Sequence, residues 1–502
     1  MKMPSELGPF HIIGIGGIGM SAIAHVMLQL GYKVQGSDMS DSMNLKRLDE
    51  MGATTFVGHA PENIDNAGCV VISSAVKPGN PERDEALRRG IPVIRRVEVL
   101  TELMRHYATI SVTGTHGKTT ITSLTAHVLV EGGIDPTVIT GGIVNDWASN
   151  ARIGEGEWMV VEADESDGTF LKLPSQVGII SNIDPEHLDH YGDFETLKAA
   201  FATFVGNIPF YGLVVAGIDN EHVFNIAESY RGSMNRRHLL TYGEHESADL
   251  RLENLHGADG FAVFDVALGK RVKGGERRLE GLKLPLPGVH NASNALASMA
   301  VALELGMSDE EIAAAFENFG GIYRRFTRAG VWNKVAIYDD YAHHPVEISN
   351  VLHAARSVTT GRVIAVKQPH RYTRVADLFD EFANCFAEAD QVIVAPVYEA
   401  GEAPIEGINH QTLARAIEKS GHQNVQTIEG QEELTARLAD MVQPGDLVIC
   451  LGAGDISQWA HALPASLTRL SAQTGSTITG SVEADAVKTD AGEAGSSAAK
   501  SA

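Results

Sequence analysis

The stretch from residue 111 to 123 constrains the fold of this chain more than any other. It reads Ser-Val-Thr-Gly-Thr-His-Gly-Lys-Thr-Thr-Ile-Thr-Ser, an apolar strand end that turns through glycines into a helix. Such a turn points backbone N–H groups toward the positive end of a helix, and Lys118 adds a full charge, so a bound polyphosphate is predicted. The usual pattern has a glycine where this chain has Val112, so Gly114 and Gly117 would form a shortened turn.

A nucleotide triphosphate with Mg²⁺ is the ligand that this loop predicts, with the Thr119 hydroxyl on the metal. An ordinary strand-to-helix turn with an exposed lysine is the alternative. The loop residues expected to contact ATP are Gly114, Thr115, His116, Gly117, Lys118, Thr119 and Thr120.

The opening residues predict a second nucleotide site. A short apolar run at 10–13 leads into Gly-Ile-Gly-Gly-Ile-Gly, followed by a helical pattern and a strand that ends at Asp38. In this context the glycines let the backbone approach a diphosphate, and the acid meets a ribose hydroxyl. NAD and a UDP-linked sugar both satisfy the pattern. The residues expected at this site are Gly14, Gly16, Gly17, Gly19 and Asp38, with His59 and Ser73 as either ligand contacts or simple turn residues.

Apolar runs alternate with polar, helix-like stretches along the 502 residues, which predicts three α/β domains with mainly parallel sheets and flanking helices. We expect a Rossmann-like domain at 1–107, a central P-loop ATPase domain at 108–319 and a second Rossmann-like domain at 320–472. Residues 473–502 are mostly Ser, Thr, Gly, Ala and Glu, so this tail is expected to be disordered.

The charge of the chain excludes some classes of partner. It carries 64 acidic against 40 basic residues, a formal net charge of −24. Nucleic acids and anionic membranes need a clustered cationic surface, so neither is expected as a partner. Cys69, Cys385 and Cys450 lie in apolar runs without metal-ligand spacing, which favours reduced core residues. The sequence has no signal peptide and no apolar run of membrane-spanning length, so we expect a cytoplasmic protein without membrane insertion.

Acidic residues follow two further strands of the central segment. Trp158-Met-Val-Val runs into Glu162-Ala-Asp-Glu-Ser-Asp, and the carboxyl end of a parallel strand suits a metal-binding carboxylate, which makes Glu162 the first choice. A solvated acidic loop is the alternative. The run from Asp184 to His190 follows another buried strand and could reach the same metal or phosphate. His187 and His190 lack a third and fourth ligand at zinc-site spacing.

Other polar residues lie further along the chain. Asn291 and Asn294 share one face of a helix, where they could bind a ligand or simply cap the helix. Arg324 and Arg325 lie between aromatic residues at the predicted domain junction, as candidates for binding carboxylate or phosphate or for a surface salt bridge. The run Asp-Asp-Tyr-Ala-His-His-Pro, residues 339–345, follows a strand of the last domain.

Taken together, these motifs resemble the Mur ligase family of peptidoglycan synthesis over about residues 10–470. The phosphate loop is common to the superfamily, which includes folylpolyglutamate synthase, whereas the opening glycines and Pro-His-Arg-Tyr-Thr-Arg are similar to the alanine-adding branch. The resemblance implies an ATP-dependent ligase that joins L-alanine to UDP-N-acetylmuramate through an acyl phosphate. The implied setting is the cytoplasm and cell-wall biogenesis, with effects on cell shape and division. We expect a monomer or a weak homodimer.

The resemblance also implies roles for individual residues. Mg²⁺ would be held by Thr119, Glu162 and His187, and ATP also by Asn291 and Asn294. Arg325 and Asp340 would complete the catalytic group with Lys118 when the last domain closes. Apart from the resemblance, the position of His343 at a strand end beside Asp340 leads us to expect that it handles the amine or carboxylate of alanine. Ala202 occupies the position of the carbamoylated lysine of other Mur ligases, so no such modification is expected.

Three alternatives remain at this stage. A muropeptide-recycling ligase, which adds a whole peptide to the same sugar nucleotide, shares most of the motifs but usually departs from the opening glycine run. A dehydrogenase would explain only the first domain. A nucleotide-dependent switch would leave the diphosphate-sugar domain and the junction arginines without a role.

Overall fold

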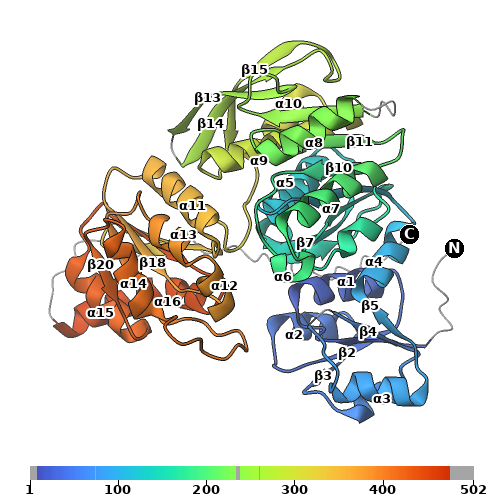
Figure 1. The fold of residues 1–502 in the computed structure, drawn as a ribbon, viewed down its shortest axis with the longest axis horizontal. Coiled ribbons are helices and arrows are strands. Elements are labelled where there is room, and N and C mark those ends of the chain that lie inside the picture. The colour runs from blue at the N-terminus through green and yellow to red at the C-terminus, as the bar shows by residue number, and fades with distance from the viewer. Residues whose placement is uncertain (1–7, 74, 233–237, 259, 475–502) are drawn as a thin grey trace, which may run out of the picture. The chain divides into compact units, whose positions relative to one another are not determined.

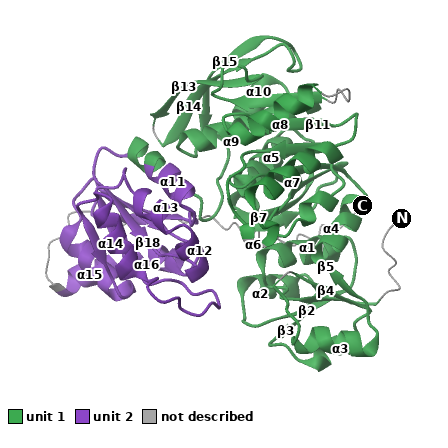
Figure 2. Ribbon diagram, in the orientation of Figure 1, with its two compact units in different colours: residues 1–325, 353–358 green, residues 326–352, 359–502 purple. Residues whose placement is uncertain are grey.

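The computed structural model describes residues 8–73, 75–232, 238–258 and 260–474, so the predicted disordered tail lies almost wholly outside the described residues. The chain divides into two compact units, residues 1–325 with 353–358 and residues 326–352 with 359–502 (Figure 2). The first unit contains two sheets and the second contains one. The predicted fold class, three α/β domains built on mainly parallel sheets, is confirmed. The exact domain boundaries stay a prediction.

The first sheet is parallel, with strand order β3-β2-β1-β4-β5 (Figure 1). Its elements are β1 (Phe10–Ile13), α1 (Ile18–Gln29), β2 (Val34–Asp38), α2 (Met43–Glu50), β3 (Thr54–Val57), β4 (Cys69–Ile72), α3 (Pro81–Arg89), β5 (Val93–Arg95) and α4 (Arg96–Met104). β1 and most of β2 and β4 are buried, as expected of parallel strands covered on both faces.

The second sheet has ten strands in the order β15-β14-β13-β12-β11-β10-β6-β9-β7-β8. Its strands are β6 (Ala108–Thr113), β7 (Thr137–Val144), β8 (Ser149–Arg152), β9 (Trp158–Glu162), β10 (Val177–Ile180), β11 (Leu213–Gly217), β12 (His238–Gly243), β13 (Leu250–Ala258), β14 (Phe261–Leu268) and β15 (Arg277–Leu284). Its helices are α5 (Lys118–Glu131), α6 (Leu188–Tyr191), α7 (Phe194–Asn207), α8 (Glu221–Gly232), α9 (Val289–Leu305) and α10 (Asp309–Glu317). The strands around β6 are parallel, while β13 to β15 and the β7–β8 pair are antiparallel.

Alternate residues of the central strands enter two different cores. In β9, Met159 and Val161 pack into a core that also contains α1 and α4 residues, whereas Val160 packs with α5 and α9 residues on the other face. The helices of the first sheet thus share an apolar core with the second sheet. Polar contacts also join the two, since Asn150 Nδ2 donates to Ile18 O at 2.5 Å and Arg47 Nη1 donates to Ala148 O at 2.6 Å.

The second unit contains a six-stranded sheet with the order β16-β17-β21-β18-β19-β20. Its strands are β16 (Thr327–Trp332), β17 (Val335–Asp340), β18 (Val363–Lys367), β19 (Gln391–Val394), β20 (Val425–Thr427) and β21 (Leu447–Leu451). Its helices are α12 (Tyr372–Asp377), α13 (Phe379–Asn384), α14 (His410–Lys419), α15 (Gln431–Met441), α16 (Ile456–Thr474) and the first part of α11 (Pro345–Val358), whose residues 353–358 are counted with the first unit. Only β16 runs antiparallel to its neighbour among these strands. In the part of the chain that the structure describes, no helix has the length and hydropathy that crossing a bilayer requires.

Candidate active site

The predicted phosphate loop joins the buried strand β6 to helix α5, which begins at Lys118. Gly114 and Gly117 both have positive φ values, +130° and +85°. A Cβ atom at Gly114 would overlap the Ser181 hydroxyl, and one at Gly117 would lie 2.8 Å from Asn294 Oδ1. Both conformation and space therefore require glycine at these two positions.

Asn182, which follows β10, accepts two hydrogen bonds from the phosphate loop. Its backbone oxygen accepts from Thr115 N at 2.9 Å, and its side-chain oxygen accepts from His116 N at 2.7 Å. These two N–H groups are therefore used within the protein. The N–H groups of the first turn of α5, Lys118 to Thr120, have no partner inside the helix and are the ones that a phosphate would meet.

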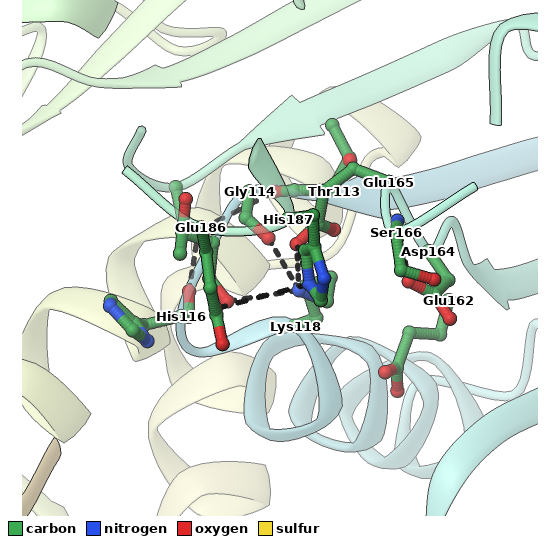
Figure 3. Close-up of polar contacts among 12 residues, drawn as sticks. Thr113, Gly114, His116, Lys118, Glu162, Asp164, Glu165, Ser166, Glu186 and His187 are labelled. Carbon is green, nitrogen blue, oxygen red and sulfur yellow. Dashed lines mark hydrogen bonds and ion pairs between the residues drawn. The ribbon is translucent and has the colours of Figure 1, made fainter. Parts of the chain in front are cut away.

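Lys118 lies at the centre of a group of oxygen atoms (Figure 3). Its Nζ donates to Gly114 O at 2.6 Å, to Thr115 O at 2.9 Å and to Glu165 Oε1 at 2.8 Å. Burial lowers the pKa of this amine, but the charges of Glu165, Asp164 and Glu162 outweigh burial and raise it above its ordinary value. Lys118 therefore stays protonated and can act on phosphate charge.

Glu165 was not selected from the sequence, yet it is the partner of Lys118. Its side chain is 1% exposed, and its Oε2 has no hydrogen-bond partner within the described residues. Burial raises the pKa of this carboxyl to about 7, even though the nearby Lys118 charge lowers it. The Tyr191 hydroxyl fixes the segment by donating to Glu165 O at 2.5 Å.

The proposed metal ligands form two neighbouring groups. Glu162 Oε2 accepts from Thr119 Oγ1 at 2.9 Å and from Gly141 N at 2.8 Å. His187, the cap residue before the short helix α6, lies instead with two carboxylates, and its Nε2 is 3.7 Å from Glu165 Oε1 and 4.0 Å from Glu186 Oε2. One ligand atom from each of His187, Glu165 and Glu186 lies within 4.8 Å of the others.

These donors suit a hard divalent cation. Carboxylate and hydroxyl oxygens are the ligands that Mg²⁺ prefers. The orphaned Glu165 Oε2 is an acceptor that a cation would satisfy. The residues present therefore fit a metal beside the phosphate loop.

The two asparagines of α9 differ in their surroundings. Asn294 is buried, with its side chain beside Gly117 of the phosphate loop. Asn291 is also buried, but its Nδ2 donates to Pro287 O at 2.8 Å, a contact within the turn that starts the helix. Asn294 thus lies at the loop, whereas Asn291 makes a local contact. Neither asparagine caps α9, because Gly288 is the cap residue and no side-chain hydrogen bond caps the helix.

The glycine loop of the first sheet is fixed by Asp38. The carboxylate accepts from Gly16 N at 3.0 Å, and a Cβ at Gly16 would lie 2.9 Å from Asp38 Oδ2. Gly14 has a φ of +75°, Gly17 caps α1, and Gly19 lies in its first turn. Asp38 therefore holds the loop in shape.

His59 belongs to a buried polar network. Its Nδ1 lies 2.9 Å from Ser37 Oγ and 3.2 Å from Glu82 Oε2. Glu82 is fully buried and was not selected from the sequence, because nothing in the helix pattern of α3 shows which acid points inward. Ser73 follows β4 and is half-buried.

In the second unit, Asp340 ends β17 and shapes the chain around it. Its Oδ2 accepts from Phe326 N and its Oδ1 from Ala342 N, both at 2.7 Å. His343 Nδ1 lies 3.3 Å from Glu347 Oε2 on the first turn of α11. Arg325 is the last residue of the first unit before the boundary, and its N–H donates to Ile322 O at 3.0 Å.

Family models match most of the chain. The model described as 'Mur ligase family, catalytic domain' covers residues 9–108. The 'Mur ligase middle domain' model covers residues 112–302, and the 'Mur ligase, glutamate ligase domain' model covers residues 324–454. All three models describe domains of one protein family.

Curated relatives match over nearly their whole length. A UDP-N-acetylmuramate–L-alanine ligase of Methylobacterium sp. (strain 4-46) is 56% identical over 94% of this chain and 99% of the relative. One of Brucella anthropi is 54% identical over 93% of this chain and 99% of its own.

Solved structures agree in fold. The UDP-N-acetylmuramate-alanine ligase of Thermotoga maritima matches with a TM-score of 0.76 and 29% identity over 93% of this chain and 100% of that one. A murein peptide ligase of Psychrobacter arcticus, 22% identical, covers 92% of this chain and 98% of its own with a TM-score of 0.67, which is a likeness of fold alone.

Proposed function

Because this chain belongs to the Mur ligase family, we propose that it joins L-alanine to UDP-N-acetylmuramate in an ATP-driven step of peptidoglycan precursor synthesis. The observation that carries the proposal is the 56% identity, over 99% of its length, to a relative of that name. The alternative, a ligase that adds a whole peptide, has weaker support, since the murein peptide ligase structure is 22% identical.

The reaction forms and breaks two bonds in turn. The lactyl carboxylate of the sugar attacks the γ-phosphorus of ATP, and ADP leaves as the acyl phosphate forms. The alanine amine then attacks the acyl carbon, and phosphate leaves as the amide forms with loss of a proton from the amine. Both steps bring anionic groups together, so catalysis depends on positive charge held in place beforehand.

Lys118 supplies such a charge. Its amine is buried and protonated at the start of α5, beside the N–H groups of the first helical turn. In this proposal Lys118 moves from Glu165 onto the phosphate oxygens when ATP binds. The residues placed around the nucleotide are Gly114, Thr115, His116, Gly117, Thr119, Thr120, Asn291 and Asn294.

Thr119, Glu162 and His187 are the residues proposed to hold Mg²⁺, with Glu165 and Glu186 beside His187. When bound, the metal would screen the charge between triphosphate and carboxylate. Glu162 also accepts from Gly141 N, so its position is set by the backbone of β7.

The glycine loop of the first sheet is the proposed site for the UDP part of the substrate. Asp38 holds the loop, and Gly14, Gly16, Gly17 and Gly19 leave space for a diphosphate above the start of α1. His59 and Ser73 are proposed to line the same site at the ends of neighbouring strands.

The last domain is proposed to bind the amino acid and to close on the others. Arg325, Asp340 and His343 are its proposed contributors, within the predicted boundaries 1–107, 108–319 and 320–472. A cytoplasmic location and a monomer or weak homodimer belong to the same proposal.

The proposed function is tested by phosphate release from ATP with the purified full-length chain. Release is expected only when UDP-N-acetylmuramate and L-alanine are both present. Replacing L-alanine with the tripeptide L-alanyl-γ-D-glutamyl-meso-diaminopimelate distinguishes the alternative. Turnover with the tripeptide and none with alanine would overturn the proposal.

A further inference from the structure

Arg96, the first residue of α4, lies against the glycine loop of the first sheet. A Cβ atom at Gly19 would overlap the Arg96 guanidinium, so the absence of a side chain at Gly19 is what lets the arginine reach the loop. Gly19 lies in the first turn of α1. The guanidinium is therefore placed beside the N-terminus of that helix.

The positive charge of Arg96 has no local partner. Within residues 8–73, 75–232, 238–258 and 260–474, this half-buried side chain makes no hydrogen bond or ion pair. Arg88 and Arg89, on the preceding helix, both pair with Glu85. The donors of the Arg96 guanidinium are therefore available to bind an anion.

The N-terminus of α1, next to Arg96, is also positively polarised. The first turn of α1 has no acidic residue, and its Gly17 cap provides no side-chain hydrogen bond. Backbone N–H groups at a helix start carry partial positive charge. Arg96 and the start of α1 therefore both carry positive charge at the glycine loop, where Asp38, hydrogen-bonded to Gly16 N, is the acid in contact with the backbone.

Arg96 also lies within electrostatic range of the phosphate-loop side of the site. Burial raises the pKa of the Asp164 carboxyl, but the charge of Lys118, hydrogen bonds from Ser166 and the charge of Arg96 together lower it below its ordinary value. Asp164 is thus close enough to sense both cations. The run after β9 that contains Asp164 also contains Glu165, the partner of Lys118.

We propose that Arg96 binds an anionic group of the sugar-nucleotide substrate, either its diphosphate or its lactyl carboxylate. The inference rests on the proposed function, because it takes UDP-N-acetylmuramate as the ligand. A guanidinium can donate two parallel hydrogen bonds to either group. Arg96 would thereby hold the sugar between the two loops.

The test is calorimetric titration of the full-length protein with UDP, UDP-N-acetylglucosamine and UDP-N-acetylmuramate, without ATP or alanine. Arg96→Gln is expected to raise the Kd for UDP-N-acetylmuramate by about ten- to a hundredfold, the range for a hydrogen bond to a charged group. An equal loss with all three ligands assigns the diphosphate. A loss confined to UDP-N-acetylmuramate assigns the carboxylate, since the other two lack it.

Arg95→Gln is the matched control, because Arg95 is the adjacent arginine and its side chain is exposed. It should leave all three Kd values unchanged. Wild-type Kd values for Arg96→Gln would overturn the inference and leave the proposed function standing. A wild-type protein that binds none of the three ligands would overturn both.

Gly19→Ala provides a second variant that keeps the arginine. Its methyl group would push the guanidinium aside, and alanine is well suited to a helix. The variant should weaken binding in the wild-type background but have a smaller effect when Arg96→Gln is already present. Additive effects in this double-mutant cycle would contradict the inference even if Arg96→Gln lowered the melting temperature.

Discussion

Lys118 is bound by protein oxygens, which a nucleotide at the proposed site would have to replace. Its Nζ donates to Gly114 O, Thr115 O and Glu165 Oε1, and the Glu165 side chain is 1% exposed. A lysine held in this manner is pre-positioned, so little side-chain freedom is lost when phosphate binds. The buried carboxylate keeps the amine at the loop in the meantime.

Lys118→Ala should therefore nearly abolish turnover and leave the binding of the sugar nucleotide intact. We expect a loss of about 100- to 1000-fold in kcat, typical of a lost electrostatic contact to the transition state. The Kd for UDP-N-acetylmuramate should stay unchanged, because that ligand is proposed to bind at the other loop. Lys198→Ala, which removes an ion pair with Glu195 on α7, is the control. Wild-type kcat in Lys118→Ala would remove the phosphate-loop assignment.

Lys367 is a charged residue in an apolar position. It is fully buried at the end of β18, where its Nζ donates to Ala342 O at 3.2 Å and lies 5.6 Å from the centre of the Phe382 ring. Burial lowers the pKa of the amine to about 8. The folded protein therefore bears an energetic cost for the charge at neutral pH.

The pKa of Lys367 fixes the sign of a pH effect. Between pH 8 and the ordinary lysine value of 10.5, the unfolded chain binds more protons than the folded chain, so stability rises with pH. Lys367→Met should remove this rise and stabilise the protein at pH 7 by roughly 1–3 kcal/mol. Calorimetric melting from pH 7 to 10 measures both effects, with exposed Lys419→Met as the control. If Lys367→Met left the slope of stability against pH unchanged, the lowered pKa of Lys367 would be contradicted.

At the scale of elements, one buried carboxylate joins three parts of the first sheet. Glu82 of α3 accepts from Ser37 Oγ of β2 at 2.5 Å and from Asn63 Nδ2 at 2.6 Å, and lies 3.4 Å from His11 Nε2 of β1. Burial alone would raise the pKa of Glu82, but the adjacent His11 side chain and hydrogen bonds from Ser37 and Asn63 lower it to about 2. The network therefore stabilises the ionised form.

The Glu82 contribution to stability should be fully present above the unfolded pKa of 4.5 and be lost as the pH falls toward 2. Glu82→Gln should lower the stability by about 3 kcal/mol at pH 7 and flatten the acid limb of the melting profile. Glu85→Gln on the same helix is the control. Its pKa is also lowered to about 2, chiefly by hydrogen bonds from Arg88 and Arg89, but these contacts lie at the surface, where the Arg88 side chain is 71% exposed, so solvent screens them and little change is expected. Equal effects of the two substitutions would contradict this account.

The sequence predicts the central elements better than the edges. Apolar runs in the sequence predict the bounds of β1, β9 and β21 closely, because strands buried on both faces need continuous apolar residues. β15 and β16 are edge strands with a mixed pattern, and the antiparallel pairing of each depends on its neighbour rather than on its own residues.

The candidate site divides in a similar way. The glycine loops could be located from sequence, because their backbone conformation needs glycine at Gly14, Gly114 and Gly117. The run Glu162-Ala-Asp-Glu-Ser-Asp offered several acids, and only the path of the chain after β9 shows that Glu165 faces Lys118. Arg96 was missed because its significance depends on a contact with Gly19 that sequence separation does not indicate.

At the scale of the whole molecule, both predicted nucleotide loops belong to the first unit. The glycine loop follows β1 and the phosphate loop follows β6, and the two sheets share one apolar core through α1 and α4. The loops are therefore held in a fixed relation by packing. The second unit has an apolar core of its own, to which β18, β21 and α16 contribute.

The last prediction concerns helix α16, at the end of the described chain, and the residues that follow it. Helix α16 ends at Thr474, and its Leu467 is 1% exposed in the core of the second unit. A match over 470 residues, 94% of this chain, covers 99% of a curated relative, so the relative lacks a counterpart for the rest of this chain. The composition of residues 475–502 offers almost no large apolar side chain to bury.

A chain that ends at Thr474 should keep the kcat, the KM values and the melting temperature of the full-length protein. A chain that ends at Ser466 loses Leu467 from the core and should melt at a lower temperature, since removing a buried leucine side chain costs about 2–5 kcal/mol. Initial rates and calorimetric melting of the three chains in parallel measure both effects. Loss of activity in the chain that ends at Thr474, at an unchanged melting temperature, would show that the final residues act in the reaction and not in the fold.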